Sequence, residues 1–395
     1  MAIKQFNPEV IQFIQDHLNS DPAELVLSAK KYPDLPINEI AVQIVSRKKA
    51  KKKLPEWYSN PNVIFPPKQN LEQASSEITA KFKSRWLRGN TIVDLTGGSG
   101  IDLFYVSKNF KEAVYVEINL ELLEITDYNF TLFGKNIEVL KSNTEEFLSS
   151  NTRKIDVIYL DPSRRTNKEK RVSGLEDYQP NVVLLYDKLL DIGKEVVIKT
   201  SPMINIKSTL KLLPDTFRIQ IVAVDNEVKE VLFYLKKGHN NEIEIEAWNI
   251  SESKKEQRFI FTYNEERDST PQITSSEEYL YEPNSAIRKS GAFNLVATRF
   301  GLEKLHSNTH LYTSDGIIEG FPGRIFKISE ILKPNKKEIR KNLKSGKVNV
   351  ISKNFPIGAN ELKKKFRLID GGDEFLIFCT STNVGKVAFK CALVS

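Results

Sequence analysis

The chain has 395 residues and carries 58 Lys and Arg against 51 Asp and Glu, with an ordinary hydrophobic fraction of 40%. Two cysteines and four histidines exclude a disulfide scaffold and leave little room for a metal site, so we expect no bound metal. The first residues lack the pattern of a signal peptide, and no stretch reaches the roughly 20 apolar residues of a membrane span, so we expect a cytoplasmic protein with no membrane partner.

The first 75 residues are predicted to form a helical region. Asn7-Pro8 and Asp21-Pro22 each place a capping side chain before a proline at the first helical position. A further helix is predicted over 38–47, continuing into the lysine-rich stretch up to residue 53. The prolines between residues 54 and 67 then indicate an ordered connector.

Residues 76–238 alternate between Val- and Ile-rich strands and helical stretches, which indicates an α/β domain with a largely parallel sheet covered on both faces. Seven strands are predicted, over 91–95, 113–118, 137–140, 155–160, 195–199, 217–224 and 230–235. Helices are predicted over 102–109, 120–133 and 182–191. The last two strands are too close in sequence for a helical crossover, so we expect them to be antiparallel.

The character of the chain changes after residue 238. We treat 239–320 as a linker that contains a polar-faced hairpin (242–248 and 258–263), a loop without periodicity at 265–278 and a helical segment. Residues 321–395 are predicted to form a small α+β domain with strands at 324–328, 348–351, 374–380 and 386–393 and helices at 336–343 and 359–366. This domain has 16 Lys and Arg against 6 Asp and Glu, a net charge of +10, whereas the rest of the chain has −3.

The sharpest motif is a glycine cluster between the first strand and the helix that follows it, Asp94-Leu95-Thr96-Gly97-Gly98-Ser99-Gly100. Glycine accepts positive φ and lets a ligand approach backbone N–H groups closely, and such a turn is the ligand-binding point of a doubly wound sheet. Glu117 ends the second strand, where a carboxylate can accept hydrogen bonds from the two hydroxyls of a ribose. The simpler alternative is a tight turn without a ligand.

The glycine spacing separates two kinds of nucleotide cofactor. The dinucleotide fingerprint G-x-G-x-x-G is absent, because the glycines fall at 97, 98 and 100. The loop instead resembles the D/E-x-G-x-G-x-G loop of class I methyltransferases, with Asp94 as the acid and Thr96 in the first glycine position. The antiparallel pair that closes the sheet also resembles the methyltransferase sheet. S-adenosylmethionine (SAM) is therefore the expected cofactor, and a nicotinamide oxidoreductase is the alternative.

The fourth strand ends in Asp161-Pro162-Ser163-Arg164-Arg165. A carboxylate at this position points into the ligand crevice, and Pro162 stiffens the loop. Asp161 is placed to accept a hydrogen bond from the attacking group or to take up its proton. The turn resembles the D/N-P-P-Y/F motif of amino-methyltransferases, with Ser163 and Arg164 replacing the second proline and the aromatic residue. Arg164 and Arg165 either hold a phosphate or form a solvated loop.

Two other positions are weaker candidates for the same crevice. Asn143 follows the third strand, where an adenine amino group is often recognised, although a turn-forming asparagine is the alternative. The segment 199–202 ends the fifth strand and either lines the crevice or is an ordinary strand exit.

Nearly the whole chain resembles a bacterial family of class I SAM-dependent methyltransferases with a C-terminal THUMP-like domain. The segments that carry the resemblance are RKKAKKKLP at 47–55, EQASSE at 72–77, DLTGGSG at 94–100, DPSRR at 161–165, YEPN at 281–284, KNFP at 353–356 and GGD at 371–373. The resemblance implies a Rossmann-like sheet of seven strands, SAM as cofactor, and a C-terminal domain that handles RNA. It also implies that the segment around Gln73 packs beside the methionine end of the cofactor.

Two functions are left open. In the first, the protein methylates a base amino or ring nitrogen of RNA, with Asp161 and Pro162 at the reaction centre and Arg164 and Arg165 at the substrate. The cofactor residues would be Gln73, Asp94, Thr96, Gly97, Gly98, Gly100, Glu117, Ile118, Asn143 and Asp161. The 47–53 run and the basic domain would neutralise the RNA backbone. In the second, the acceptor is a protein or small molecule, or the protein only binds SAM, and the basic domain is an interaction surface or a solvated face.

Overall fold

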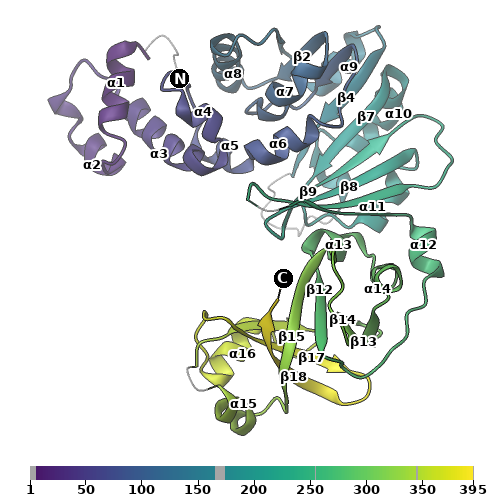
Figure 1. Cartoon of the computed structure of the whole chain (residues 1–395). Coiled ribbons are helices and arrows are strands. Elements are labelled where there is room, and N and C mark those ends of the chain that lie inside the picture. Colours follow the sequence, from purple (N-terminus) through teal and green to yellow (C-terminus); the bar gives the residue numbers. More distant parts are fainter. Residues whose placement is uncertain (1–5, 165–173, 254, 344–345, 395) are drawn as a thin grey trace. The chain divides into compact units, whose positions relative to one another are not determined.

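The computed structural model describes residues 6–164, 174–253, 255–343 and 346–394 (Figure 1). The chain divides into two compact units, one formed by residues 1–217 and 231–241 and the other by residues 218–230 and 242–395. None of the described helices combines the length and the apolar character needed to cross a bilayer.

The first unit begins with a helical region, as predicted. Its helices are α1 (Pro8–Asp16), α2 (Pro22–Leu27), η2 (Ala29–Lys31), α3 (Ile37–Lys53), α4 (Pro55–Ser59), α5 (Lys68–Gln73) and α6 (Glu77–Lys83). Both predicted caps form, because the side chains of Asn7 and Asp21 accept the backbone N–H groups of Val10 and Ala23 at 2.9 and 2.8 Å. Apolar side chains of α1, α2 and α3 form one buried cluster that also includes Ile125 of the later helix α8 (Leu120–Leu132).

The central sheet has the seven strands expected from the sequence and two more. The strands are β1 (Thr91–Asp94), β2 (Glu112–Glu117), β3 (Glu138–Lys141), β4 (Ile155–Leu160), β7 (Gly193–Thr200), β8 (Thr216–Val224), β9 (Glu227–Leu235), β10 (Glu244–Ile250) and β11 (Gln257–Phe261). Their order is β11-β10-β8-β9-β7-β4-β1-β2-β3. Strands β1, β2, β3, β4 and β7 pair in parallel, and β9 runs antiparallel to β7.

The reversed pair that closes the predicted sheet is also present. Strands β8 and β9 are neighbours, and only Asp225 and Asn226 connect them. Both residues have positive φ, at 48° and 65°, which is the backbone of a two-residue hairpin turn. The α/β fold with this closing pair is therefore confirmed. Strands β10 and β11 extend the sheet beyond the seven strands, on the segment predicted as a hairpin.

Helices connect the parallel strands in the way that the sequence indicated. They are α7 (Ile101–Val106), η3 (Ser107–Asn109), α8 (Leu120–Leu132), α9 (Thr144–Ser150), α10 (Val182–Ile192) and α11 (Ile206–Leu212), while the turn after β4 contains the short elements β5 (Ser163–Arg164), η4 (Leu175–Asp177) and β6 (Tyr178–Gln179). The loop predicted at 265–278 was partly wrong, because α12 (Tyr263–Asp268) occupies its start. This helix depends on a capping box between Thr262 and Glu265, and its six residues are too few to show periodicity.

The second unit contains a seven-stranded sheet in the order β13-β14-β12-β15-β18-β17-β16. Its elements are β12 (Tyr279–Pro283), α13 (Ser285–Ser290), α14 (Leu295–Phe300), β13 (Glu303–His306), β14 (Thr309–Ser314), β15 (Gly323–Leu332), α15 (Lys336–Asn342), β16 (Asn349–Lys353), α16 (Ala359–Phe366), β17 (Glu374–Ser381) and β18 (Gly385–Leu393). Helices α15 and α16 share a buried apolar cluster with strands β15, β17 and β18. The predicted order of elements in the last 75 residues is therefore confirmed.

Candidate active site

The glycine loop lies between β1 and α7, at the carboxyl end of a central strand. Gly98 and Gly100 have φ of +57° and +68°, in the left-handed region that side chains other than glycine rarely adopt. A Cβ atom on Gly97 would lie 2.3 Å from the ring of Tyr115 on β2, a distance that no real contact allows. The loop therefore requires glycine both for its conformation and for its packing against β2.

Glu117 ends β2, as the sequence predicted, and lies directly against this loop. Its Oε2 atom accepts the backbone N–H of Gly98 at 2.8 Å, and its Oε1 atom accepts the N–H of Asn119 at 2.7 Å. These two bonds fix the carboxylate at the end of β2 while leaving each oxygen with a further lone pair. The next side chain, Ile118, is 61% exposed and presents apolar surface beside the carboxylate.

Asn143 has a clear structural role at the start of α9. It is the N-cap of this helix, and its Oδ1 atom accepts the backbone N–H of Glu146 at 2.8 Å as part of a capping box. The following residue, Thr144, donates its hydroxyl to the backbone carbonyl of Leu95 at 2.8 Å. The start of α9 is therefore attached to the glycine loop, with the Oδ1 atom of Asn143 engaged in the cap.

The Asp161 turn is bonded directly to the glycine loop. The backbone N–H of Asp161 donates to Oγ1 of Thr96 at 2.6 Å, and that hydroxyl lies 3.3 Å from Oδ1 of Asp94. The Oδ2 atom of Asp161 forms a 2.6 Å ion pair with Nζ of Lys199 at the end of β7. Thr96, which replaces the first glycine of the loop pattern, therefore joins the glycine loop to the Asp161 turn. Pro162, the next residue of this turn, is buried.

The two arginines of the turn are described only in part. Ser163 and Arg164 form β5, which pairs antiparallel with β6 through Gln179 and Tyr178. Arg165 lies outside the described residues, as does the side chain of Arg164. Their predicted contact with the substrate remains a prediction.

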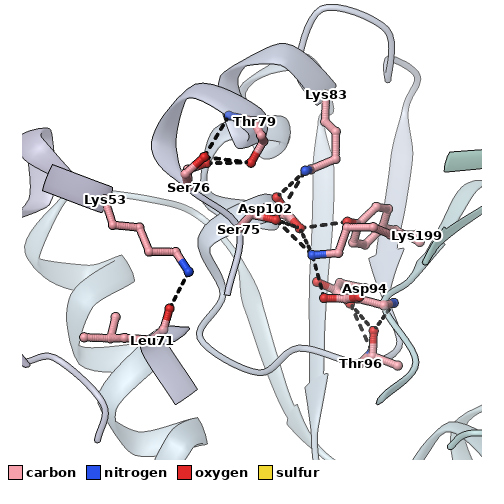
Figure 2. A network of polar contacts seen from close by, with 12 residues as sticks. Lys53, Leu71, Ser75, Ser76, Thr79, Lys83, Asp94, Thr96, Asp102 and Lys199 are labelled. Atoms are coloured by element: carbon pink, nitrogen blue, oxygen red, sulfur yellow. Dashed lines mark hydrogen bonds and ion pairs between the residues drawn. The ribbon is translucent and has the colours of Figure 1, made fainter. Parts of the chain in front are cut away.

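A buried network of charges is joined to Asp161 through Lys199, and Figure 2 shows its residues Lys83, Asp102 and Lys199. Its centre is Asp102 on α7, 7% exposed, whose Oδ1 and Oδ2 atoms lie 3.2 Å from Nζ of Lys83 and 3.2 Å from Nζ of Lys199. The hydroxyls of Tyr159 and Ser75 donate to Oδ2 at 2.7 and 2.8 Å. Figure 2 shows the two lysine side chains converging on this carboxylate from different elements.

The network sets the charge of the neighbouring carboxyl groups. Burial, together with the nearby Asp102 and Asp161 carboxylates, raises the pKa of Asp94 to about 7, although the hydrogen bonds from Thr96 oppose this shift. Burial also raises the pKa of Asp161, and Lys199 only partly offsets this. For Asp102 burial is the largest influence, but Lys199 and Lys83 together bring its pKa below the ordinary value. Among the described residues, no three His, Cys, Asp or Glu side chains are arranged to hold a metal ion.

Sequence reasoning missed most of this network. Asp102 and Lys83 carry no motif, and the only signal for Asp102 is a charged residue inside an otherwise apolar helix. Lys199 belongs to the segment 199–202, for which the sequence left open whether it lines the crevice or is an ordinary strand exit. Gln73, which the resemblance places at the cofactor, is exposed at the end of α5. Ser75, two residues further on, connects this segment to the network through Lys199, at 2.9 Å, and Asp102.

The basic run at 47–53 is not a continuous cationic surface. Arg47 is 2% exposed, and its guanidinium donates to the carbonyls of Val63, at 2.6 Å, and Pro61. Lys53 donates to the carbonyl of Leu71 at 2.6 Å (Figure 2). The prediction that the whole run contacts RNA was therefore wrong for Arg47, because this side chain satisfies buried carbonyls of the connector after α3 and α4.

The C-terminal domain does present a basic surface on α15, α16 and their flanks. Exposed Lys and Arg side chains with no carboxylate within 4.0 Å, among the residues that the structure describes, are Lys333, Lys336, Lys337, Arg340, Lys341, Lys364, Lys365 and Arg367. Because α15 and α16 share one apolar cluster, these cations belong to neighbouring helices.

Comparisons with known proteins assign the chain to a family. Residues 279–322 match a ferredoxin-like domain family and residues 323–392 match a THUMP domain-like family. A solved protein of Porphyromonas gingivalis W83, described as a candidate methyltransferase, is 32% identical, with 98% of each chain covered and a TM-score of 0.88. The chain belongs to this methyltransferase family with a C-terminal THUMP-like domain.

More distant solved structures resemble part of this methyltransferase. A candidate methyltransferase of Streptococcus mutans in complex with SAH is 14% identical over 40% of this chain and 96% of that chain. An rRNA methylase of Streptococcus thermophilus is 17% identical over 40% of this chain and 94% of that chain. Both have a TM-score of 0.30, which is too low to bear on the function of this chain. No curated protein matches the chain.

Proposed function

We propose that this methyltransferase belongs to class I and transfers the methyl group of SAM to a base nitrogen of RNA. The observation that carries the proposal is the direct junction between the glycine loop and the Asp161 turn through Thr96. It brings the glycine loop and the Asp161 carboxylate to one place at the carboxyl edge of the sheet, which supports a shared site for cofactor and acceptor.

The residues around the loop fit SAM better than a dinucleotide. The carboxyl groups of Asp94 and Glu117 lie against the loop, and SAM is cationic at its sulfonium and its amino group, whereas a dinucleotide brings an anionic pyrophosphate. Glu117 would accept the ribose hydroxyls through its remaining lone pairs, and the exposed Ile118 would cover the adenine. The loop residues 96–100 would approach the cofactor with their backbone, and Gln73 would lie at its methionine end.

Asp161 would orient the acceptor. Lys199 holds its Oδ2 atom, and Oδ1 accepts no hydrogen bond from any residue that the structure describes. We infer that Oδ1 accepts an N–H of the acceptor nitrogen and takes up the proton after transfer, to which the raised pKa of this carboxyl is suited. The bound cofactor supplies an activated methyl group, so alignment of the acceptor is the main task of the protein.

An RNA acceptor is supported by the unpaired cations of α15 and α16 and by the net charge of +10 in residues 321–395. Arg164 and Arg165 would contact a phosphate of the same RNA. We also predict a cytoplasmic location and domain boundaries at residues 75, 238 and 320.

The test is methyl transfer from labelled SAM into RNA and protein extracted from a strain that lacks the gene, because only undermodified material exposes the target. Label in the RNA fraction supports the proposal, and label only in the protein fraction, or in neither fraction, contradicts it. With that substrate, Asp161→Ala should slow transfer by at least a hundredfold and change SAM affinity by less than about threefold. Equal rates for Asp161→Ala and the native protein would remove Asp161 from the reaction.

A further inference from the structure

The second unit contains one buried carboxylate with three cations around it. Glu282, at the end of β12, is 2% exposed. Its Oε1 atom lies 2.9 Å from Nη1 of Arg288 on α13 and 2.7 Å from Nζ of Lys353 at the end of β16. Its Oε2 atom accepts Nε of Arg324 on β15 at 2.9 Å and also contacts Nη2 of that side chain. Glu282 and Lys353 belong to the YEPN and KNFP segments of the family resemblance, but the proposed reaction uses neither.

The charges of this cluster do not balance. Among the residues that the structure describes, Glu282 is the only carboxylate within 4.0 Å of the three cations. One negative charge therefore faces three positive charges, an excess of two in a place that water reaches only in part. Neutralising a buried glutamate requires one cation, and every further unpaired cation adds a desolvation cost.

The excess charge affects the neighbouring groups. The pKa of Lys353 is lowered by burial and by repulsion from Arg288 and Arg324, in spite of the ion pair with Glu282. His310, stacked on Phe293, has its pKa lowered to about 4 by burial and by the cations nearby. A bound anion would relieve both effects.

The three cations remain accessible to a ligand. The exposed side-chain fractions are 26% for Arg288, 35% for Arg324 and 21% for Lys353. The contacts with Glu282 use only part of their donors, since a guanidinium has five N–H groups and an ammonium has three. The guanidinium of Arg324 lies over the ring of Phe326, 5.4 Å from its centre, which restricts its orientation. Two partly buried arginines and a lysine form the donor set that best matches a phosphate group.

We propose that Arg288, Arg324 and Lys353 form a binding site for a phosphate group of the RNA acceptor. Glu282 and Arg288 come from the ferredoxin-like match and Arg324 and Lys353 from the THUMP-like match, so the site lies where these two domains join. The inference rests on the proposed RNA substrate and names the place in the second unit that would hold its backbone.

Lys353→Gln is the most informative variant, because Arg288 and Arg324 still neutralise Glu282 when Lys353 loses its charge. Lys390→Gln is the matched control, since Lys390 is similarly shielded at 15% exposure but faces two carboxylates, Glu330 and Glu374, and leaves no excess charge. Two probes are used on the full chain: thermal stabilisation by inorganic phosphate at constant ionic strength, and binding of labelled transfer RNA over a range of salt concentrations. The labelled-SAM assay is run in parallel.

We expect Lys353→Gln to weaken both the phosphate response, meaning the thermal stabilisation by inorganic phosphate, and transfer RNA binding about tenfold or more. The slope of log affinity against log salt should fall by about one. Lys390→Gln should stay within about twofold of the native protein in both measurements. Glu282→Gln, which adds to the excess, should strengthen the phosphate response even if it lowers the melting temperature. A phosphate response lost in Lys353→Gln with unchanged RNA affinity would mean that the site takes free phosphate and overturns the RNA assignment. If phosphate does not stabilise the protein, and Lys353→Gln binds transfer RNA as tightly as the native protein does, the phosphate site is overturned. The labelled-SAM assay then tests methyl transfer into RNA independently of this site.

Discussion

The charge of Asp94 near neutral pH depends on the fold. Its carboxyl is 3% exposed and its pKa is raised to about 7, so the folded protein holds a proton that the unfolded chain releases near pH 4. Between these two values the native state binds more protons than the unfolded state, and the free energy of unfolding therefore falls as the pH rises. Above pH 7 both states are ionised and the contribution becomes constant.

Asp94→Asn should remove this dependence. Relative to the native protein, the variant should gain about 2–3 kcal/mol in free energy of unfolding between pH 5 and pH 8, which urea denaturation at a series of pH values measures. Asp156→Asn is the control, because the hydrogen bond from Lys194, with those from the backbone of Asn90 and Thr91, lowers the pKa of Asp156 to about 2. Its offset from the native protein should stay constant over the same range. A constant offset for Asp94→Asn as well would contradict the raised pKa.

Glu117 offers the most direct test of the cofactor. A carboxylate that accepts two ribose hydroxyls contributes about 1.5–3 kcal/mol, so Glu117→Ala should weaken SAM binding by roughly tenfold to a hundredfold in calorimetry. Glu112→Ala, at the exposed start of the same strand, should leave the dissociation constant unchanged. If both variants bind SAM like the native protein, Glu117 does not contact the ribose.

At the scale of single elements, α9 connects the glycine loop to the third strand. Its first residue bonds to the carbonyl of Leu95, and its N-cap is Asn143. Serine caps a helix about as well as asparagine but is too short to reach a bound adenine. Substitutions of Asn143 can therefore distinguish a role in capping α9 from a role in recognising adenine.

Asn143→Ser should leave both the free energy of unfolding and the SAM affinity close to the native values, whereas Asn143→Ala should cost about 1 kcal/mol of stability. Urea denaturation and calorimetry on the two variants measure these quantities. A tenfold loss of SAM affinity in Asn143→Ser at native stability would show instead that the side chain reads the adenine.

Elements whose signals lie within a few residues could be predicted from the sequence. The caps at Asn7 and Asp21, the glycine loop and the alternation of strands and helices follow from spacing, proline and glycine rules and hydrophobic periodicity. Contacts between distant residues could not. Thr96 and Asp161 are 65 positions apart, and nothing in either motif indicates that the threonine hydroxyl accepts the backbone N–H of Asp161. The sequence likewise predicts an exposed Arg47, because only the folded structure brings the carbonyl of Val63 to its guanidinium.

At the scale of the whole molecule, charge is concentrated near the C-terminus. The net charge of +10 in residues 321–395 contrasts with −3 in the remainder, and the unpaired cations gather on α15, α16 and their flanks. Each phosphate contact releases counterions, so the affinity for RNA should depend steeply on salt.

Replacing the four basic residues of α15, Lys336, Lys337, Arg340 and Lys341, by glutamine should reduce the slope of log affinity against log salt by about two to three. Fluorescence anisotropy with labelled transfer RNA provides the measurement. The matched control replaces four exposed lysines outside the regions predicted to contact RNA, Lys30, Lys31, Lys188 and Lys211, and should change the slope by less than about one. Equal slopes for the α15 variant and the native protein would identify these lysines as a solvated face.

The hydroxyl of Ser75 has a consequence for how this protein can be divided. Ser75 lies ahead of α6, yet it contacts both Lys199 and Asp102 in the buried network next to Asp161. Trp57 of α4 meets Phe104 of α7 edge to face, with ring centres 5.0 Å apart. A fragment that starts at β1 would therefore lack Ser75, which bonds to Asp102, and Trp57, which packs against α7. The helical region and the sheet are expected to be inherited, exchanged between relatives and expressed as a single piece.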